Sequence, residues 1–144
     1  MSTEKTINGT KLRVMKEDIT LMEVQAFVYY AQHDLKLGSG TGSAITMRGG
    51  PGVEKEATAL GPIETTEAVT TGAGELKAAH IIHAVGPRFQ EPQTEQKLHA
   101  TMVNLLKQAE AKGIETLALP IMGYGFYGVP LDVSAKVSLK AIKE

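Results

Sequence analysis

The sequence contains no cysteine and few aromatic residues. Without cysteine there can be no disulfide, no thiolate nucleophile and no cysteine-ligated metal. Aromatic residues make up only 5% of the 144 residues, yet Tyr124, Phe126 and Tyr127 stand close together in the stretch LPIMGYGFYGVP (119–130). Gly123, Gly125 and Gly128 flank them, and a retained glycine usually marks a sharp turn or a close approach to the backbone. The clustering of aromatic residues and glycines therefore makes residues 119–130 a candidate functional segment.

Long apolar runs and a strong net charge are also missing. No apolar run reaches the roughly 18 residues that a membrane helix needs, and the start, MSTEKTINGTK, lacks the apolar core of a signal peptide. We therefore expect a cytoplasmic protein with no membrane partner. Fifteen basic and 16 acidic residues give a net charge of −1, which argues against bulk binding to nucleic acid but allows one small anion in a local site.

The length and hydrophobic pattern predict a single α/β domain over residues 1–144. Strand-like and helix-like segments alternate along the chain, which is typical of a mixed sheet with helices on both faces. Asn8-Gly9 is a hairpin turn signal. The predicted strands are residues 11–19, 24–31, two on either side of Gly72 to Gly74, and 114–120. The predicted helices are residues 43–60 with a break at Gly49 to Pro51, 94–112 with Gly113 as its C-cap, and a last helix from Pro130.

Two glycine-rich loops each follow a strand and lead into a helix: GSGTGSA (38–44) and GYGFYGVP (123–130). Helix N-termini carry free N–H groups and partial positive charge, so such loops suit a phosphate or diphosphate. The alternative is that both are only tight turns. A P-loop is excluded because no Gly-Lys pair exists. A Rossmann fingerprint also fails, because Ser43 stands where its last glycine would be.

Taken together, these segments resemble the macro domain family, which binds ADP-ribose. The resemblance runs in order through EDIT (17–20), FVYYAQHDLKLGSGTGSAI (27–45), GAGELKAAHIIHAVGP (72–87) and ALPIMGYGFYGVP (118–130). It implies a three-layer α/β/α fold. Family members usually continue into another strand and helix, on the order of 25 more residues. The resemblance therefore leaves three alternatives here: a truncated or naturally short form with an unfilled sheet edge, a sheet that closes differently, or a gap that another chain fills. An unfilled edge would invite association with a second copy of the chain.

The resemblance also implies roles for individual residues. Asp18 would accept a hydrogen bond from the adenine amino group, although it could instead cap a helix. Residues 123–128 would wrap the diphosphate, with Phe126 and Tyr127 against the ribose. Ligand-binding residues expected in this way are Asp18, Ile19, Ala31, Gln32, Gly38, Ser39, Gly40, Thr41, Gly42, Pro120, Gly123, Tyr124, Gly125, Phe126 and Tyr127.

Several positions depart from the family pattern. Gln32 replaces an asparagine that binds the distal ribose, and it is the only candidate for a catalytic residue. Branches that hydrolyse ADP-ribosyl esters carry acidic or histidine side chains at positions that are Leu37, Gly42 and Thr46 here, and none of these supplies a general base. The sequence therefore favours a module that binds ADP-ribose or an ADP-ribosylated protein. The alternatives are an ADP-ribosyl ester hydrolase and a scaffold that has lost its ligand.

The histidines give no sign of a metal site, and no cofactor is expected. His80 and His83 are three residues apart in a predicted strand, so they face opposite sides of the sheet and cannot share an ion. We expect His83 to be a hydrogen-bonded structural residue, and His33 and His99 to be solvated.

Overall fold

The computed structural model of the chain describes residues 3–7, 10–14, 19–37, 41–86, 93–114 and 116–119. Strands and helices alternate along these residues, as the sequence predicts. The elements are β1 (Thr3–Ile7), β2 (Thr10–Val14), the 3-10 helix η1 (Ile19–Leu21), β3 (Ala26–Tyr30), α1 (Thr41–Gly49), α2 (Gly52–Leu60), β4 (Ala68–Gly72), β5 (His80–Ala84), α3 (Thr94–Ala111) and β6 (Leu117–Ala118).

The larger sheet of the described residues has four strands in the order β4-β5-β3-β6. Strand β3 runs parallel to both β5 and β6, whereas β4 pairs with β5 in the antiparallel direction. The sheet is therefore mixed, as expected. Because β3, β5 and β6 are parallel, their carboxyl ends meet at one edge of the sheet.

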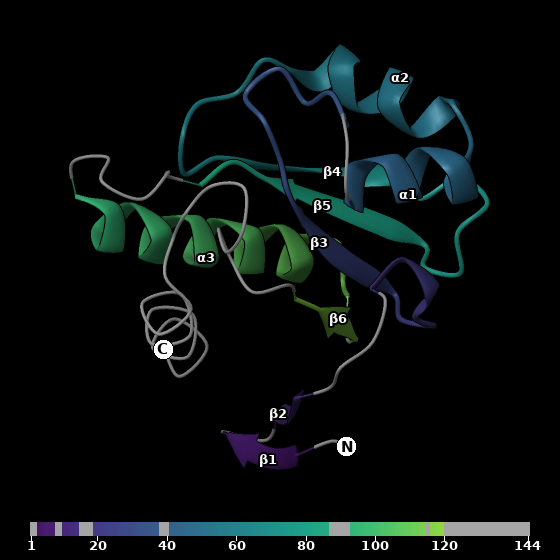
Figure 1. The fold of residues 1–144 in the computed structure, drawn as a ribbon. Coiled ribbons are helices and arrows are strands. Elements are labelled where there is room, and N and C mark those ends of the chain that lie inside the picture. The colour runs from purple at the N-terminus through teal and green to yellow at the C-terminus, as the bar shows by residue number, and fades with distance from the viewer. Residues whose placement is uncertain are drawn as a thin grey trace.

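Helices cover both faces of this sheet (Figure 1). On one face, Phe27, Tyr29 and Ile81 belong to a buried cluster with Ile45 of α1 and Val53 of α2. On the other face, a second buried cluster joins the sheet to α3, and its members are Val28, Ile82, Ala84, Leu98, Met102, Leu105 and Ala109. Alternate strand residues thus point to opposite cores, and the fold is the predicted three-layer α/β/α arrangement.

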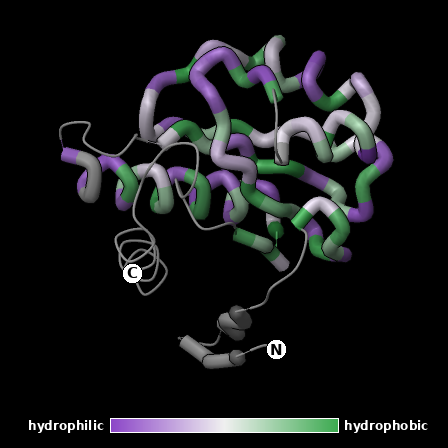
Figure 2. Tube along the Cα trace, in the orientation of Figure 1, coloured by the Kyte–Doolittle hydropathy of each residue, from purple (hydrophilic) through white to green (hydrophobic). Residues whose placement is uncertain are grey.

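Helix α3 is amphipathic, in agreement with its sequence pattern. Leu98, Met102 and Leu105 are completely buried, and Leu106 packs against the same cluster. Hydrophobic and hydrophilic residues alternate around its turns in Figure 2. Gly113 follows the helix with a φ of 67°, a left-handed conformation that favours glycine. The predicted glycine stop just past the helix is therefore confirmed, and Lys112 is the C-cap residue that precedes it.

Two predicted boundaries are wrong. The strand expected over residues 11–19 ends at Val14, and Ile19 instead begins η1, whose turn is closed by the Met22 N–H on the Ile19 carbonyl at 3.4 Å. The first glycine loop was expected to extend to residue 44, but α1 already begins at Thr41. Helix hydrogen bonds place Ile19 in η1 and Thr41 in α1, and alternation of residue types does not reveal them.

The N-terminal hairpin and the helix break follow the glycine signals. Strands β1 and β2 are antiparallel with Ile7 opposite Thr10, which leaves the two residues Asn8-Gly9 between them. Helices α1 and α2 are separate, with Gly50 at φ 92° between them. The predicted helix from Pro130 lies outside the described residues. No helix within the described ranges is long and apolar enough to cross a membrane.

Candidate functional site

The candidate site lies at the edge where β3, β5 and β6 end. Ala31 directly follows β3 and is fully buried, and its N–H continues the sheet by donating to the Ala84 carbonyl of β5 at 2.8 Å. Gln32 comes next and is exposed. Ligands in open α/β sheets commonly lie at this kind of edge. Two of the predicted ligand-binding residues are therefore adjacent at the carboxyl edge, with the Gln32 side chain open to solvent.

A tight turn carries the chain from Gln32 toward α1. The Leu35 N–H donates to the Gln32 carbonyl at 3.0 Å, and the Lys36 N–H donates to the Asp34 carboxylate at 3.0 Å. Leu35 has a φ of 63°, which is rare for a bulky residue. Its side chain is completely buried in the core. Core packing therefore holds a strained backbone position three residues after Gln32.

His33 ties the same turn to the segment between α2 and β4. Its Nδ1 lies 2.9 Å from the Ile63 carbonyl oxygen, and the Ile63 N–H donates to the His33 carbonyl at 3.0 Å. Because the carbonyl can only accept, Nδ1 carries the proton. The side chain is exposed, as expected, but it is held by a specific hydrogen bond. His33 is therefore solvent-exposed, as the sequence predicts, and it also makes a hydrogen bond that the sequence does not reveal.

Leu37 and Gly42 form the most constrained contact at this edge. The Tyr29 hydroxyl donates to the Leu37 carbonyl at 2.7 Å, and the Leu37 N–H donates to the Glu54 carboxylate at 2.9 Å. Gly42, in the first turn of α1, lies against this carbonyl. A Cβ added at Gly42 would overlap the Leu37 carbonyl oxygen and come within 2.6 Å of the Tyr29 hydroxyl. Glycine is therefore the residue that this packing accepts.

A second tyrosine meets a second glycine nearby. Tyr29 and Tyr30 point to opposite cores, with Tyr29 8% exposed and Tyr30 partly buried beside the α3 cluster. A Cβ at Gly86, two residues after β5, would overlap the Tyr30 hydroxyl. Both tyrosines of YYAQ therefore pack against glycines that follow strands or begin a helix. Glycine is recognisable in the sequence as a turn or close-approach signal, whereas no local pattern indicates these tyrosine partners.

Of the remaining predicted ligand-binding residues, some lie in the part of the chain that the structure describes and others lie outside it. Ile19 is half-buried and packs against the core cluster shared with α1, and the Arg48 guanidinium donates to the Thr20 hydroxyl at 2.7 Å, which ties η1 to α1. Thr41 is the first residue of α1. The positions outside the described residues are Asp18, Gly38, Ser39, Gly40, Pro120, Gly123, Tyr124, Gly125, Phe126 and Tyr127.

The positions at which hydrolysing family members carry an acidic or histidine side chain hold non-basic residues in this chain. Leu37 is 1% exposed and packed in the core. The Thr46 hydroxyl donates to the Gly42 carbonyl at 3.2 Å, within α1. None of the residues Leu37, Gly42 and Thr46 therefore has a side chain placed to abstract a proton.

His83 is a buried structural residue, as expected. Its Nε2 lies 2.9 Å from the Thr71 hydroxyl, and the Tyr29 ring meets its edge with centroids 6.0 Å apart. Since the Thr71 hydroxyl donates to the Gly72 carbonyl at 2.9 Å, it accepts from His83, so Nε2 carries the proton. Burial lowers the pKa of His83 to about 4. No group of metal-ligating side chains occurs among the residues that the structure describes.

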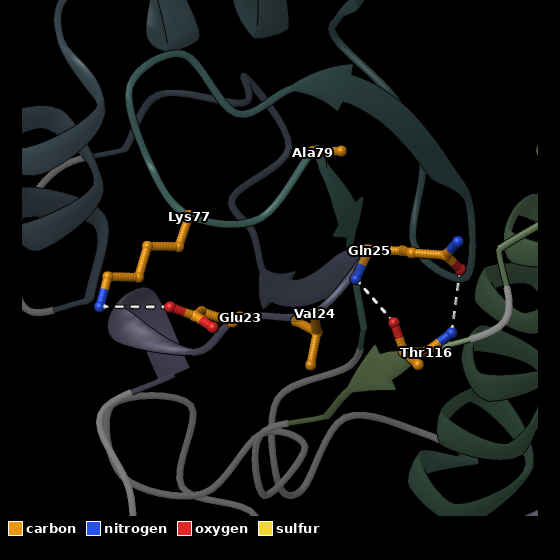
Figure 3. A pocket seen from close by; sticks show the side chains of 6 residues that line it. All are labelled: Glu23, Val24, Gln25, Lys77, Ala79 and Thr116. Atoms are coloured by element: carbon orange, nitrogen blue, oxygen red, sulfur yellow. Dashed lines mark hydrogen bonds and ion pairs between the residues drawn. The ribbon is translucent and has the colours of Figure 1, made fainter.

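A shallow hollow of about 510 Å³ lies at the opposite, amino edge of the sheet (Figure 3). Residues just before β3, β5 and β6 line it. Gln25 and Thr116 bond reciprocally there: the Gln25 N–H donates to the Thr116 hydroxyl at 2.8 Å, and the Thr116 N–H donates to the Gln25 amide oxygen at 3.1 Å. Lys77 and Glu23 form an exposed ion pair at 3.9 Å. The hollow precedes these strands and the candidate site follows them, so the two lie at opposite edges of the sheet.

Comparison with known sequences identifies the family. The macro domain family model matches residues 28–138. An uncharacterised protein of Sulfurisphaera tokodaii is 38% identical over 137 residues, which cover 92% of this chain and 75% of that protein. A macro domain-containing protein of Caldanaerobacter subterraneus is 34% identical over 140 residues, covering 93% of this chain and 80% of that protein. The chain belongs to the macro domain family.

Solved structures agree with this assignment. The chain is similar to the Oceanobacillus iheyensis macrodomain solved with ADP, with a TM-score of 0.94 and 26% identity over 99% of this chain and 80% of that one. A variant of the same macrodomain solved with ADPR gives the same TM-score and identity, covering 82% of that chain. The fold is therefore that of macrodomains.

Proposed function

We propose that the chain is a single-domain binding module, over residues 1–144, for ADP-ribose or a related derivative, free or attached to protein. The observation that carries the proposal is the arrangement at the carboxyl edge. There Ala31 and Gln32 follow β3, and α1 begins at Thr41 with Gly42 packed against Leu37 of the segment that leaves the strand. The first turn of a helix offers unpaired N–H groups and positive partial charge to an anion.

Two solved relatives support the choice of ligand. The Oceanobacillus iheyensis macrodomain was solved with ADP, and its variant with ADPR. Both ligands share the adenosine diphosphate group that the two glycine loops of this chain are proposed to hold. The proposed contacts are the backbone N–H groups of residues 38–42 and 123–127, with Asp18 and Ile19 at adenine and Gln32 near the distal ribose.

Binding is favoured over hydrolysis for a structural reason. In this chain Gly42 has no room for a side chain, Leu37 is buried and the Thr46 hydroxyl is bonded within its own helix. None of these three residues carries a side chain that can act as a general base. Gln32 is exposed, but an amide does not abstract protons at neutral pH.

A thermal shift experiment and a turnover assay test this proposal together. At ADP-ribose concentrations about 100 times Kd, binding should stabilise the fold by about 2.7 kcal/mol. An ester-linked ADP-ribosylated protein should release little or no ADP-ribose. Absence of any thermal shift would favour a macro-like scaffold without ligand. Robust release that is lost in Gln32→Ala would show instead that the chain is a hydrolase.

A further inference from the structure

The two backbone polar groups of Leu37 are both bonded to side chains from other elements. Its N–H donates to the Glu54 carboxylate of α2 at 2.9 Å, and its carbonyl accepts from the Tyr29 hydroxyl of β3 at 2.7 Å. Leu37 lies between β3 and α1, outside regular structure, so neither group can pair in a strand or a helix. Buried backbone groups of this kind need such partners.

These anchors fix Leu37 in both position and orientation. The Leu37 side chain is 1% exposed, and Tyr29 is itself held in the core with its ring against His83. A hydrogen bond to an ionised carboxylate is stronger than one to a neutral group. Bonds on opposite sides of one residue, together with a buried side chain, prevent its peptide planes from rotating.

The Leu37 carbonyl packs directly against the first turn of α1. Gly42 packs so closely on the Leu37 carbonyl that no Cβ fits between them, and an added Cβ would lie 2.5 Å from the carbonyl carbon. A shift of the Leu37 carbonyl would therefore move the first turn of α1. That turn contains Thr41 and Gly42, which the proposed function places at the diphosphate.

We propose that Glu54 and Tyr29 are positioning residues for diphosphate binding, acting through the Leu37 backbone on the first turn of α1. This inference rests on the proposed function. Neither side chain needs to contact the ligand. The Glu54 carboxylate is negative and would repel a diphosphate, so its contribution is the hydrogen bond and not its charge.

The chain supplies a matched control in the same helix. Glu56, two residues further along α2, also accepts a backbone N–H through its carboxylate, from Gly72 of β4 at 3.2 Å. Glu54→Ala and Glu56→Ala therefore remove the same chemistry from one helix. Only the first variant releases the segment that precedes α1.

The experiment compares four variants of the full chain with wild type. Glu54→Ala and Tyr29→Phe remove one Leu37 bond each, Glu54→Gln keeps an acceptor without the charge, and Glu56→Ala is the control. Calorimetry with ADP-ribose and with adenosine measures binding. Amide hydrogen exchange of the peptide that contains Leu37 and Gly42 measures the anchoring without ligand, and melting temperatures report stability.

We expect Glu54→Ala to weaken ADP-ribose binding about tenfold, because losing the hydrogen bond to the Leu37 N–H releases the backbone on which the first turn of α1 packs. Adenosine binding should not change, since adenosine has no diphosphate. Exchange of the Leu37 amide should accelerate. Tyr29→Phe should act in the same direction, whereas Glu54→Gln should restore wild-type affinity or exceed it.

Three results would overturn the inference, and they are distinguishable. Wild-type affinity and exchange in Glu54→Ala and Tyr29→Phe would show that Leu37 does not need these anchors. Equal losses in Glu54→Ala and Glu56→Ala would assign the effect to general stability of α2. If the wild-type chain binds no ADP-ribose, the proposed function itself fails and the positioning role fails with it.

Discussion

Replacing Gly42 with alanine tests the packing at the carboxyl edge with the smallest possible change. The added Cβ would lie 2.5 Å from the Leu37 carbonyl carbon and 2.6 Å from the Tyr29 hydroxyl oxygen, and it would overlap the Leu37 carbonyl oxygen. Real Cβ atoms essentially never approach closer than 3.0 Å. The Leu37 backbone would have to move by at least 0.5 Å, the difference between 2.5 and 3.0 Å.

The loss of stability in Gly42→Ala can be estimated from the contacts that this movement disrupts. Displacing the carbonyl separates it from the Tyr29 hydroxyl, and an unsatisfied buried pair costs about 1–3 kcal/mol. Overpacking adds about 1–3 kcal/mol, while the better helix propensity of alanine returns about 1 kcal/mol. The net loss of about 1–5 kcal/mol corresponds to a melting temperature lower by roughly 3–20 °C for a chain of this length. ADP-ribose binding should weaken as well, since the first turn of α1 moves.

Gly52→Ala is the matched control for Gly42→Ala. Gly52 begins α2, and a Cβ there would meet nothing within 4 Å. This variant should keep its stability or gain a few tenths of a kcal/mol from the helix propensity of alanine. Thermal denaturation and calorimetry of both variants decide the question. If Gly42→Ala melts with Gly52→Ala and binds ADP-ribose equally well, the described contact between Leu37 and α1 is wrong.

Three further predictions concern pH and the ligand. Burial lowers the pKa of His83 from 6.5 to about 4 in the folded chain, so only the unfolded chain takes up this proton between those values; about 3 kcal/mol of stability should be lost as pH falls from 6.5 to 4. Urea denaturation across this range should show the slope, and His83→Gln should remove it. Gly125→Val should abolish ADP-ribose binding, because a β-branched side chain would fill the proposed phosphate position; calorimetry showing wild-type affinity would remove the diphosphate from that loop. Asp18→Ala should weaken ADP-ribose binding but leave a ligand without adenine nearly unaffected, and equal losses for both ligands would rule out an adenine contact.

Much of the fold could be predicted from the sequence because its signals are local and periodic. The apolar run VQAFVYYA predicts a buried strand, and the helical spacing of Leu98, Met102 and Leu105 predicts one buried helix face; the structure confirms both. Asn8-Gly9 and Gly113 predict a turn and a cap for reasons confined to a few residues. Element ends were less predictable, since hydrogen bonds such as that closing η1 leave no pattern in residue type.

The contacts that shape the candidate site were not predictable in the same way. Glu54 reads as an ordinary acidic residue in the first turn of a helix, and nothing local indicates that its carboxylate bonds a backbone 17 residues earlier. The sequence marked Gly42 as part of a glycine loop, but its partner Tyr29 becomes visible only when β3 and α1 are placed together. Contacts between distant segments depend on the tertiary arrangement, which a single sequence does not state.

A calorimetric titration of the wild-type chain with ADP-ribose, AMP and adenosine tests the central claim most directly. Most of the proposed contacts go to the diphosphate, so ADP-ribose should bind most tightly, AMP more weakly and adenosine weakest, with a Kd for ADP-ribose that is micromolar or weaker. Circular dichroism of the same sample confirms that it is folded. No heat of binding with ADP-ribose from a folded chain, or adenosine binding as tightly as ADP-ribose, would contradict the account.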